Sequence, residues 1–333
     1  MSAKRALITG ATGFVGANLA RLALERGRTV RVLVRKGSDR RNIPESTSVE
    51  VFEGDLRDAD SVRKAVKGCD EVFHVAADYR FWAKDSRELY ESNVEGTKNL
   101  LESARIEGVG KFVHTSTVGT IGLSQAPLPC NEGTPEDPNQ WGSHYKLSKL
   151  QAEKLALDAA KSGMPVVIVN PSTPIGAWDR KPTPTGKIIV DFVQGKIPAY
   201  VHTGLNFVHV RDVCEGHLLA AEKGKIGERY ILGNQNLTMI EFLKLLGKLT
   251  GRKAPRFRIP YPIAYAVGAV STAYADHISR KEPGVALEAV KMSKRYMFFD
   301  SSKAVRELGL PQTPIQDAAQ EGLNWFSQNG YLN

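Results

Sequence analysis

Residues 7 to 16 read LITGATGFVG, an apolar run followed by glycines at positions 10, 13 and 16. The run predicts a buried β-strand, and residues 14 to 26 predict a helix directly after it. Glycine suits such a junction because the chain turns sharply and its backbone must approach a phosphate without an intervening Cβ. A plain strand-to-helix turn can also be rich in glycine. The position one strand into the chain, with a helix and a second strand following, favours a dinucleotide-binding site.

The alternation of strand and helix continues to about residue 170. Short β-branched runs occupy residues 5–10, 29–35, 48–54, 71–77, 111–117 and 165–171, and helical patterns fill 14–26, 58–67, 88–107 and 144–162. Most of these runs are apolar throughout, as in strands that are buried on both faces. This order predicts an α/β protein with a Rossmann-type, doubly wound parallel sheet.

After residue 170 prolines and loops interrupt the rhythm. A strand-like run at 206–210 and another at 228–233 are expected to return to the sheet, and a capping box of Thr238 and Glu241 predicts a helix that ends at Gly251. We therefore predict a dinucleotide-binding domain over residues 1–170, with 206–233 returning to it. A smaller, mostly helical substrate-binding lobe is expected from residues 171–205 and 234–333.

Composition narrows the class of protein. The 333 residues are 42% hydrophobic and 24% charged, which allows a large core and does not indicate disorder. The three cysteines are odd in number and form no C-x-x-C pair, so neither a disulfide framework nor a metal site is predicted, and a cytoplasmic setting fits best. The net charge of +9 is scattered apart from residues 35–41, and without a nucleic-acid motif no nucleic-acid partner is expected.

Targeting and membrane segments are not expected. The N-terminus enters a strand directly, and no stretch reaches the roughly 18 apolar residues of a membrane span. The most apolar segment, PIAYAVGAVSTAYA at 262–275, is short and predicts a packed helix of the lobe. A helix lying on a membrane surface is the alternative for this segment, and no stable membrane insertion is predicted.

The end of the second predicted strand bears on cofactor choice. An acidic residue at this point would bind the ribose hydroxyls of NAD, whereas this chain has Arg35 and Lys36, with Arg40 and Arg41 close behind. Cations here suit the 2′-phosphate of NADP, and a solvated basic loop is the alternative. Asp55, just after the third strand, suits the adenine amino group of a cofactor. Its alternative role is to cap the next helix, which Asp58 could also do.

Residues 143 to 149, SHYKLSK, place Tyr145 four residues before Lys149, on one face of a predicted helix and one turn apart. The stretch HTSTVGTIG places Ser116 and Thr117 at the end of the fifth predicted strand. Strand ends and helix starts share one edge of a doubly wound sheet, so the four side chains are expected to meet there.

Seven motifs in this order resemble the extended short-chain dehydrogenase/reductase family, also called the NAD-dependent epimerase/dehydratase family. They are TGATGFVG, GDL, HVAA, NVEGTKNLL, TSTVG, YKLSK and FVHVRDV, and they span about two thirds of the chain. Within the family, the chain looks most like the dihydroflavonol-4-reductase-like branch. Residues 170–210 are similar to the hopanoid-associated sugar epimerases.

The resemblance implies catalytic roles. Tyr145 would be the general acid/base, and Lys149 would stabilise its tyrosinate and contact the nicotinamide ribose. The hydroxyl that binds the substrate oxygen is assigned to Thr117, with Ser116 as the second choice, and Asn93 either supports the site or makes a structural bond. A free tyrosine titrates near 10. A nearby ammonium and an oxidised nicotinamide ring are expected to lower that value.

The resemblance also implies contacts with the cofactor NADP(H) and with the substrate. The expected cofactor contacts are Gly10, Thr12, Gly13, Phe14, Val15, Gly16, Arg35, Lys36, Asp55, Leu56, Ala76, Ala77, Ser116, Tyr145, Lys149, Pro171 and Ser172. The stretch DYRFW (78–82) offers Tyr79, Arg80 and Trp82 as substrate contacts, and core packing of Phe81 and Trp82 is equally consistent with their type.

Three functions remain open at the level of sequence. The first is an NADPH-consuming reductase of a ketone or aldehyde, and the second is a sugar epimerase, linked to hopanoid biosynthesis, with no net use of cofactor. The third, a non-enzymatic NADP-sensing protein, has no need of the Tyr145 proton donor. The partner is expected to be a small carbonyl compound or sugar, and the family resemblance implies a homodimer.

Overall fold

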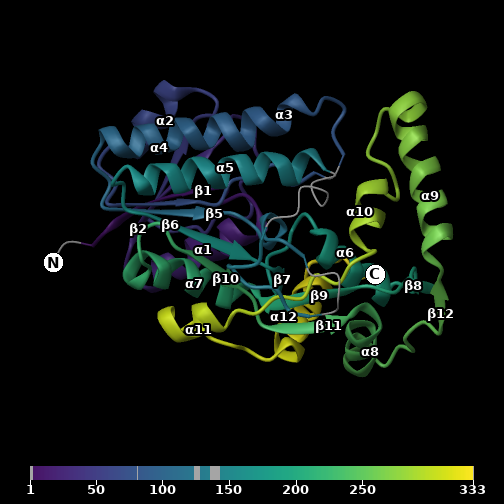
Figure 1. Ribbon diagram of the computed structural model, residues 1–333. Coiled ribbons are helices and arrows are strands. Elements are labelled where there is room, and N and C mark those ends of the chain that lie inside the picture. The colour runs from purple at the N-terminus through teal and green to yellow at the C-terminus, as the bar shows by residue number, and fades with distance from the viewer. Residues whose placement is uncertain (1–2, 81, 124–127, 136–142, 333) are drawn as a thin grey trace.

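The structure, a computed structural model, describes residues 3–80, 82–123, 128–135 and 143–332. Its centre is a seven-stranded sheet in the order β10-β6-β5-β4-β1-β2-β3, and every neighbouring pair is parallel (Figure 1). The strands are β1 (Arg5–Thr9), β2 (Thr29–Val34), β3 (Val49–Glu53), β4 (Glu71–His74), β5 (Lys111–Thr115), β6 (Val166–Pro171) and β10 (Arg229–Leu232). The predicted Rossmann-type doubly wound sheet is therefore confirmed.

Helices cover both faces of this sheet (Figure 1). One face carries α1 (Phe14–Glu25) and α7 (Val210–Lys223), and the other carries α2 (Ala59–Val66), α4 (Gly96–Ile106) and α5 (His144–Lys161). The apolar run of β1 explains why two covering layers are needed. Leu7 and Ile8 are both fully buried, yet Ile8 packs in the cluster beneath α1 and Leu7 in the cluster beneath α2 and α4.

The strand order reverses between β1 and β4. The chain runs outward from β1 to β2 and β3, and then returns to place β4 on the other side of β1. In open sheets of this kind ligands bind at such a switch point, outside the carboxyl ends of the strands. The turn after β1 and the loop after β4 lie directly beside each other at this edge, because β1 and β4 pair in register from Ala6 and Glu71 to Thr9 and His74.

A second group of elements lies beyond β6. β7 (Thr173–Ile175), β9 (Gly204–His209) and β11 (Gln235–Thr238) form a three-stranded sheet, and β8 (Ala199–Val201) pairs with β12 (Phe257–Ile259). Packed with them are α6 (Pro184–Val193), α8 (Met239–Thr250) and α12 (Ile315–Gln328), whose apolar cluster includes Phe207 stacked on Phe242 at 4.2 Å. The capping box of Thr238 and Glu241 begins α8, and Gly251 ends it in a left-handed conformation, as predicted.

The segment at 206–210 lies in a different sheet from the one expected. β10 does pair with β6 in the large sheet, but β9 pairs with β7 on one side and β11 on the other. The physical reason is the chain that follows β6. It leads into β7 after one residue, and β7 takes β9 as its partner outside the large sheet.

The last elements are α9 (Tyr261–Tyr274), a π-helical turn (Ala275–Ser279), α10 (Leu287–Met292) and α11 (Ser302–Leu308). α9 stands at the edge of the molecule with α10 on its inner side (Figure 1). Only Ala264 and Gly268 of α9 are buried, so the helix packs along one narrow strip instead of being enclosed by the lobe. Within the described residues, no helix has the length and apolarity to cross a membrane.

Candidate active site

The turn after β1 has no room for side chains at its glycines. Gly10 has φ +75°, and a Cβ built on it would lie 2.8 Å from the backbone of Ala76. A Cβ on Gly16 would collide with the carbonyl oxygen of Gly10, so α1 packs directly against the turn. Gly13 precedes α1 and offers no side-chain cap, which leaves the first N–H groups of the helix available to an anion.

The loop after β4 is fastened to this turn. The Thr9 hydroxyl accepts hydrogen bonds from the N–H groups of Val75 at 3.1 Å and Ala76 at 3.0 Å, and it contacts His74 Nδ1 at 2.9 Å. Asn42, which is buried, adds a contact of 3.4 Å from its Nδ2 to the Thr12 carbonyl. The expected contacts Ala76 and Ala77 are thereby brought beside Gly10, Thr12 and the start of α1, where Phe14 and Val15 lie.

A surface pocket of about 680 Å³ lies between the ends of β2 and β3, and its lining includes Arg35, Lys36, Asp55 and Asp58. Arg35 and Lys36 are exposed, and neither forms an ion pair within the part of the chain that the structure describes. The two later cations differ. Arg40 binds Glu53 at 2.7 Å, and Arg41 binds Asp39 at 2.6 Å. Two of the four cations are therefore available to an anion in this pocket.

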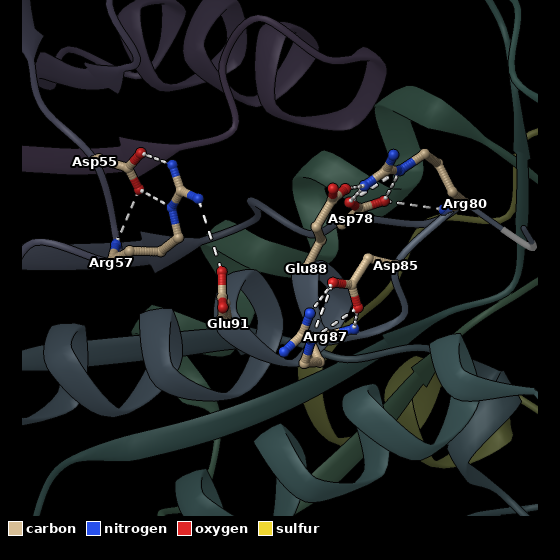
Figure 2. A network of polar contacts seen from close by, with 8 residues as sticks. All are labelled: Asp55, Arg57, Asp78, Arg80, Asp85, Arg87, Glu88 and Glu91. Atoms are coloured by element: carbon tan, nitrogen blue, oxygen red, sulfur yellow. Dashed lines mark hydrogen bonds and ion pairs between the residues drawn. The ribbon is translucent and has the colours of Figure 1, made fainter. Parts of the chain in front are cut away.

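Asp55 is engaged by its neighbour Arg57 (Figure 2). Arg57 Nε lies 3.0 Å from Oδ1 and Nη2 lies 2.7 Å from Oδ2, which lowers the pKa of the Asp55 carboxyl. Capping of α2 falls to Asp58, whose carboxylate accepts the N–H of Asp60 at 3.1 Å. The carbonyl of the half-buried Leu56, which lies between Asp55 and Asp58 in the chain, accepts a hydrogen bond from the Asn99 side-chain amide. Asp55 is thus free of the capping role and faces the pocket.

Tyr145 lies in the first turn of α5, which begins with the Ser143 hydroxyl accepting the N–H of Lys146 at 3.2 Å. Burial raises the pKa of Tyr145 to about 12, and a hydrogen bond with the Thr117 side chain acts in the opposite direction. The direction differs from the expected lowering because removal of the phenolate from water outweighs the other effects on it. Thr117, the preferred of the two hydroxyls, is the one that contacts Tyr145.

Lys149 is 3% exposed and donates a hydrogen bond of 2.7 Å from Nζ to the carbonyl of Thr115, the last residue of β5. Burial lowers the pKa of Lys149 to about 8, and the negative charge of Glu153 opposes this shift. The ammonium is therefore held at the end of β5, one helical turn from Tyr145.

A buried network that the sequence did not reveal supports the Thr117 turn. Thr120 Oγ1 donates to Glu153 Oε2 at 2.8 Å, and Asn170 Nδ2 donates to the same oxygen at 2.8 Å and to the Thr117 carbonyl at 3.1 Å. Ser116 Oγ lies 3.4 Å from Thr120 Oγ1, so this side chain joins the network. The sequence held one indication that Glu153 belongs to this site: it follows Lys149 by four residues, just as Lys149 follows Tyr145.

Asn93 connects this helix to the loop after β4. Its side-chain oxygen Oδ1 accepts the N–H of Asp78 at 2.7 Å, and its Nδ2 donates to the Asp78 carbonyl at 3.0 Å and to Ser148 Oγ at 3.0 Å. Ser148 Oγ donates in turn to the Tyr145 carbonyl at 2.8 Å. Asn93 lies in a π-helical turn (Glu91–Glu95), a feature often found at functional sites.

Comparison with known proteins agrees with this geometry. The model of the NAD dependent epimerase/dehydratase family matches residues 6–233, a span from β1 to just beyond β10 that includes the glycine turn, Thr117, Tyr145 and Lys149. The chain belongs to this family.

Relatives within the family cover nearly the whole chain. A Synechocystis protein named for dihydroflavonol 4-reductase is 44% identical over 98% of this chain and 95% of its own length. The sterol demethylase protein B of Methylococcus capsulatus is 35% identical over 98% and 99%, respectively. Among solved structures, gox2253 has a TM-score of 0.88 and 45% identity over 99% of this chain and 100% of that one. A nucleoside-diphosphate-sugar epimerase from Pseudomonas aeruginosa, PA4631, has a TM-score of 0.81 and 26% identity, with full coverage of both chains.

The family and its dihydroflavonol-reductase-like branch are thus confirmed, and the chain is an extended short-chain dehydrogenase/reductase of a family of reductases, epimerases and dehydratases. The link to hopanoids stays a prediction.

The expected substrate contacts of this family member are less available than predicted. Arg80 Nε lies 2.9 Å from Asp78 Oδ1 and its Nη2 lies 2.7 Å from Glu88 Oε2, which raises the pKa of Arg80 (Figure 2). Trp82 Nε1 donates to Asp276 Oδ1 at 2.6 Å, beyond the end of α9. Tyr79 is 44% exposed and influences the pKa of Tyr145. Phe81 lies outside the described residues.

Two further expected cofactor contacts of this family member end β6. Pro171 is its last residue, and the N–H of Ser172 donates to the Leu232 carbonyl at 3.0 Å. The Ser172 hydroxyl is buried and has no hydrogen-bond partner in the described part of the chain. A buried hydroxyl without a partner is uncommon, and it points to a polar ligand group.

Lys146 is a further residue of the site that the sequence did not predict. It is 5% exposed, its ammonium makes no hydrogen bond or ion pair in the region described, and burial, followed by the charge of Arg295, lowers its pKa. A methyl group placed on Gly119 would lie 3.4 Å from Thr117 Oγ1 and 3.8 Å from Lys146 Cε. The lysine therefore borders the same space as Thr117. The sequence does not indicate this position, because a lysine in the first turn of a helix is usually exposed.

Proposed function

We propose that the chain is an NADP(H)-dependent oxidoreductase that reduces a ketone or aldehyde to a secondary or primary alcohol. The observation that carries this proposal is the hydrogen-bonded pair of Thr117 and Tyr145, one helical turn from Lys149 and at the same sheet edge as the glycine turn. Relatives named for dihydroflavonol and for 3β-hydroxysteroid, at 44% and 30% identity, favour an apolar ring ketone as the substrate class.

The chain fits a nicotinamide dinucleotide at several places. The close approach at Gly10 and Gly16 leaves the start of α1 open to a pyrophosphate, and the Ser172 hydroxyl without a partner suits a polar group of the ring. Arg35 and Lys36 would bind a 2′-phosphate, and Asp55 the adenine amino group. The cofactor, when bound, supplies the hydride.

The side chains of the site would handle the proton. With a pKa near 12, Tyr145 keeps its phenolic proton at neutral pH, which is the state required to donate a proton to a carbonyl oxygen during reduction. Thr117 would orient that oxygen through its hydroxyl, and the cation of Lys149 would stabilise the phenolate left behind. Lys146 offers a further cation to an electronegative group of the substrate beside the carbonyl.

Epimerisation of a sugar is the second candidate. It is favoured by the family description and by the nucleoside-diphosphate-sugar epimerase that shares the fold at 26% identity. The same Thr117, Tyr145 and Lys149 would then remove a hydroxyl proton and return it on the way back, and no cofactor would be consumed.

Cofactor stoichiometry separates the candidates. We would incubate the protein with NADPH and a panel of steroid-type and flavanone-type ketones, and separately with nucleotide sugars. The proposal predicts one NADPH oxidised for each alcohol formed. Epimerised sugar with no net change in NADPH would establish the second candidate, and tight NADPH binding without turnover on any panel member would favour an NADP-sensing protein.

A further inference from the structure

The outer face of α9 is an apolar surface that nothing in the described structure covers. Five large side chains, exposed by 51% to 70%, recur every three or four positions, so that they line one side of the helix and the turn after it. They are Ile263 (56%), Val267 (51%), Val270 (70%), Tyr274 (54%) and Ile278 (69%). We call these five residues the α9 stripe.

The helix is unusual among exposed helices because it carries no charge. Residues 261 to 274 include no Lys, Arg, Asp or Glu, although most of them face solvent. Its contacts are made through the opposite side, where Gly268 lies against Val290 and Leu287 of α10. An exposed surface helix normally has a polar outer face, so an apolar one indicates a partner.

A basic segment adjoins the stripe. Arg252, Lys253, Arg256 and Arg258 are all exposed, and none of them forms an ion pair in the described structure. Phe257, between two of these arginines, is 77% exposed. No acidic residue occurs from 242 to 275, so the positive charge of the segment is not compensated nearby along the chain.

We propose that the α9 stripe and the basic segment together bind the surface of an anionic phospholipid membrane, with α9 lying in the plane of the interface. Apolar side chains on one face with basic residues beside them are the chemistry that recognises such a surface, since the chains enter the acyl boundary and the cations meet lipid phosphates. The binding is peripheral, in keeping with a helix of 14 residues.

Charge argues against a second copy of this chain as the occupant. In a two-fold dimer the same patch would meet itself, and the uncompensated basic segments would come together with like charges. The net charge of +9 adds a general repulsion between copies and a general attraction to an anionic surface.

The docked helix would adjoin the substrate side of the site. Asp276, in the turn that continues α9, accepts the Trp82 indole N–H at 2.6 Å, and Trp82 belongs to the segment that includes Tyr79. Membrane docking goes beyond the proposed reductase activity and does not depend on it.

Vesicle flotation tests the proposal on the full chain. Vesicles of phosphatidylcholine with phosphatidylglycerol are expected to carry the protein upward, and vesicles of phosphatidylcholine alone to carry about tenfold less. Raising the salt concentration from about 0.1 M to about 0.5 M should release most of the protein, because the phosphate contacts are screened. Equal binding to both vesicles, or no binding to either, would overturn the proposal.

Matched variants locate the surface. Val270→Asp with Ile278→Asp, and separately Arg256→Glu with Arg258→Glu, are each expected to lower vesicle binding at least tenfold. The controls are Ile226→Asp, at another exposed apolar position (53%), and Lys64→Glu with Lys67→Glu, at two exposed lysines near α2 without ion pairs. All variants should keep the NADPH affinity and thermal midpoint of the parent.

Two results from these variants would overturn the proposal. One is an equal loss of binding in the controls, which would show that net charge alone drives the association. The other is a dimer, seen by sedimentation velocity, that the Val270→Asp and Ile278→Asp pair dissociates while the parent fails to bind anionic vesicles. The stripe would then be a subunit interface.

Discussion

The hydroxyl of Tyr145 illustrates how the environment of one residue changes its chemistry. The sequence places an ammonium one helical turn away, which predicts a lowered pKa, but the folded site buries the phenol and directs Lys149 to the Thr115 carbonyl. Burial then dominates and holds the phenol protonated. The residue type and spacing were readable from the sequence, whereas the sign of the shift depends on packing that only the fold provides.

Removal of the Tyr145 hydroxyl tests its role as proton donor. Tyr145→Phe should lower kcat by about 10²- to 10⁴-fold, the range typical of a lost general acid, while the dissociation constant for NADPH stays the same. Tyr90→Phe is the matched control, because its hydroxyl contacts His144 at 3.1 Å on the exposed side of α5. Turnover at the parental rate in Tyr145→Phe would remove the residue from the mechanism.

The unpaired cations Arg35 and Lys36 predict a preference for NADPH. Changing both to alanine should weaken NADPH binding about tenfold or more, through the loss of charge-assisted hydrogen bonds, and leave NADH binding nearly unchanged. Arg40→Ala with Arg41→Ala removes the same charge from cations already bound to Glu53 and Asp39, and should have little effect. Isothermal titration of the parent and the two double variants with both cofactors tests this prediction. Comparable constants for NADPH and NADH in the parent would contradict the preference.

Lys146 is expected to lower the stability of the protein while it contributes to substrate binding. Because most of the Lys146 side chain is buried and this burial lowers the pKa of its ammonium, Lys146→Met should raise the free energy of unfolding by about 1–3 kcal/mol. If the cation meets the substrate, KM should rise while the dissociation constant for NADPH does not. Urea unfolding and steady-state kinetics measure the two effects. A loss of stability in Lys146→Met would show that the lysine makes a structural contact instead.

At the scale of elements, the sequence predicted the long helices and the buried strands within one or two residues at most ends. α5 is an example, expected at 144–162 and found at His144–Lys161 with Ser143 as its cap. The strands that were not expected, β7, β8, β11 and β12, have only three or four residues, too few to show a period. Their partners come from distant parts of the chain, as when β12 pairs with β8, and local patterns hold no record of such pairings.

In the candidate site, too, the residues on local motifs were predicted, whereas the contacts between distant segments were not. Thr117, Tyr145 and the glycine turn lie on motifs of fixed local spacing, and the structure brings them to one edge of the sheet. Asn170 and Glu153 meet only because β6 packs against α5, so a single sequence could not pair them. Arg80 is a different case: Asp78 and Glu88 lie near it in the sequence, but only the structure shows that both carboxylates bind its guanidinium.

The burial of α5 against the sheet makes stability depend on pH through Lys149. Its pKa of about 8 in the folded state lies below the ordinary 10.5, so between these values the unfolded chain binds more protons at this position. The contribution of Lys149 to the free energy of unfolding therefore rises with pH in that window, and its full cost is present below pH 8.

The comparison of Lys149→Met with the parent isolates this effect. From pH 8 to pH 9.5 the free energy of unfolding of the parent should gain about 2 kcal/mol relative to Lys149→Met, and the change should be absent below pH 7. Lys161→Met, at an exposed end of the same helix, should show a constant difference across the range. Urea unfolding at several pH values measures both. A constant difference for Lys149→Met would mean that the buried lysine titrates as it does in the unfolded chain.

At the scale of the whole molecule, we propose two lobes, a cofactor-binding sheet and a substrate lobe, with boundaries near residues 170, 210 and 233, because β9 pairs in the smaller sheet and α7 begins at Val210. The large sheet has apolar clusters on both faces, and α6, α8 and α12 share a third cluster around Phe207 and Phe242. α9 belongs to none of these three clusters. Local stability should therefore differ strongly between the sheet and α9, because a helix with few buried contacts opens without unfolding the rest.

Hydrogen exchange with two ligands separates these regions. NADPH should slow amide exchange at residues 10–16, 35–38 and 74–77, where its phosphates and the strand ends meet, and leave 261–279 unchanged. Anionic vesicles should slow amide exchange at 261–279 and leave the glycine turn unchanged, because the lipid would contact α9, which shares no element with that turn. Vesicles of phosphatidylcholine alone serve as the control. Protection of α9 by NADPH equal to that of the glycine turn would show instead that the substrate lobe closes on the cofactor as one body, and that α9 moves with it.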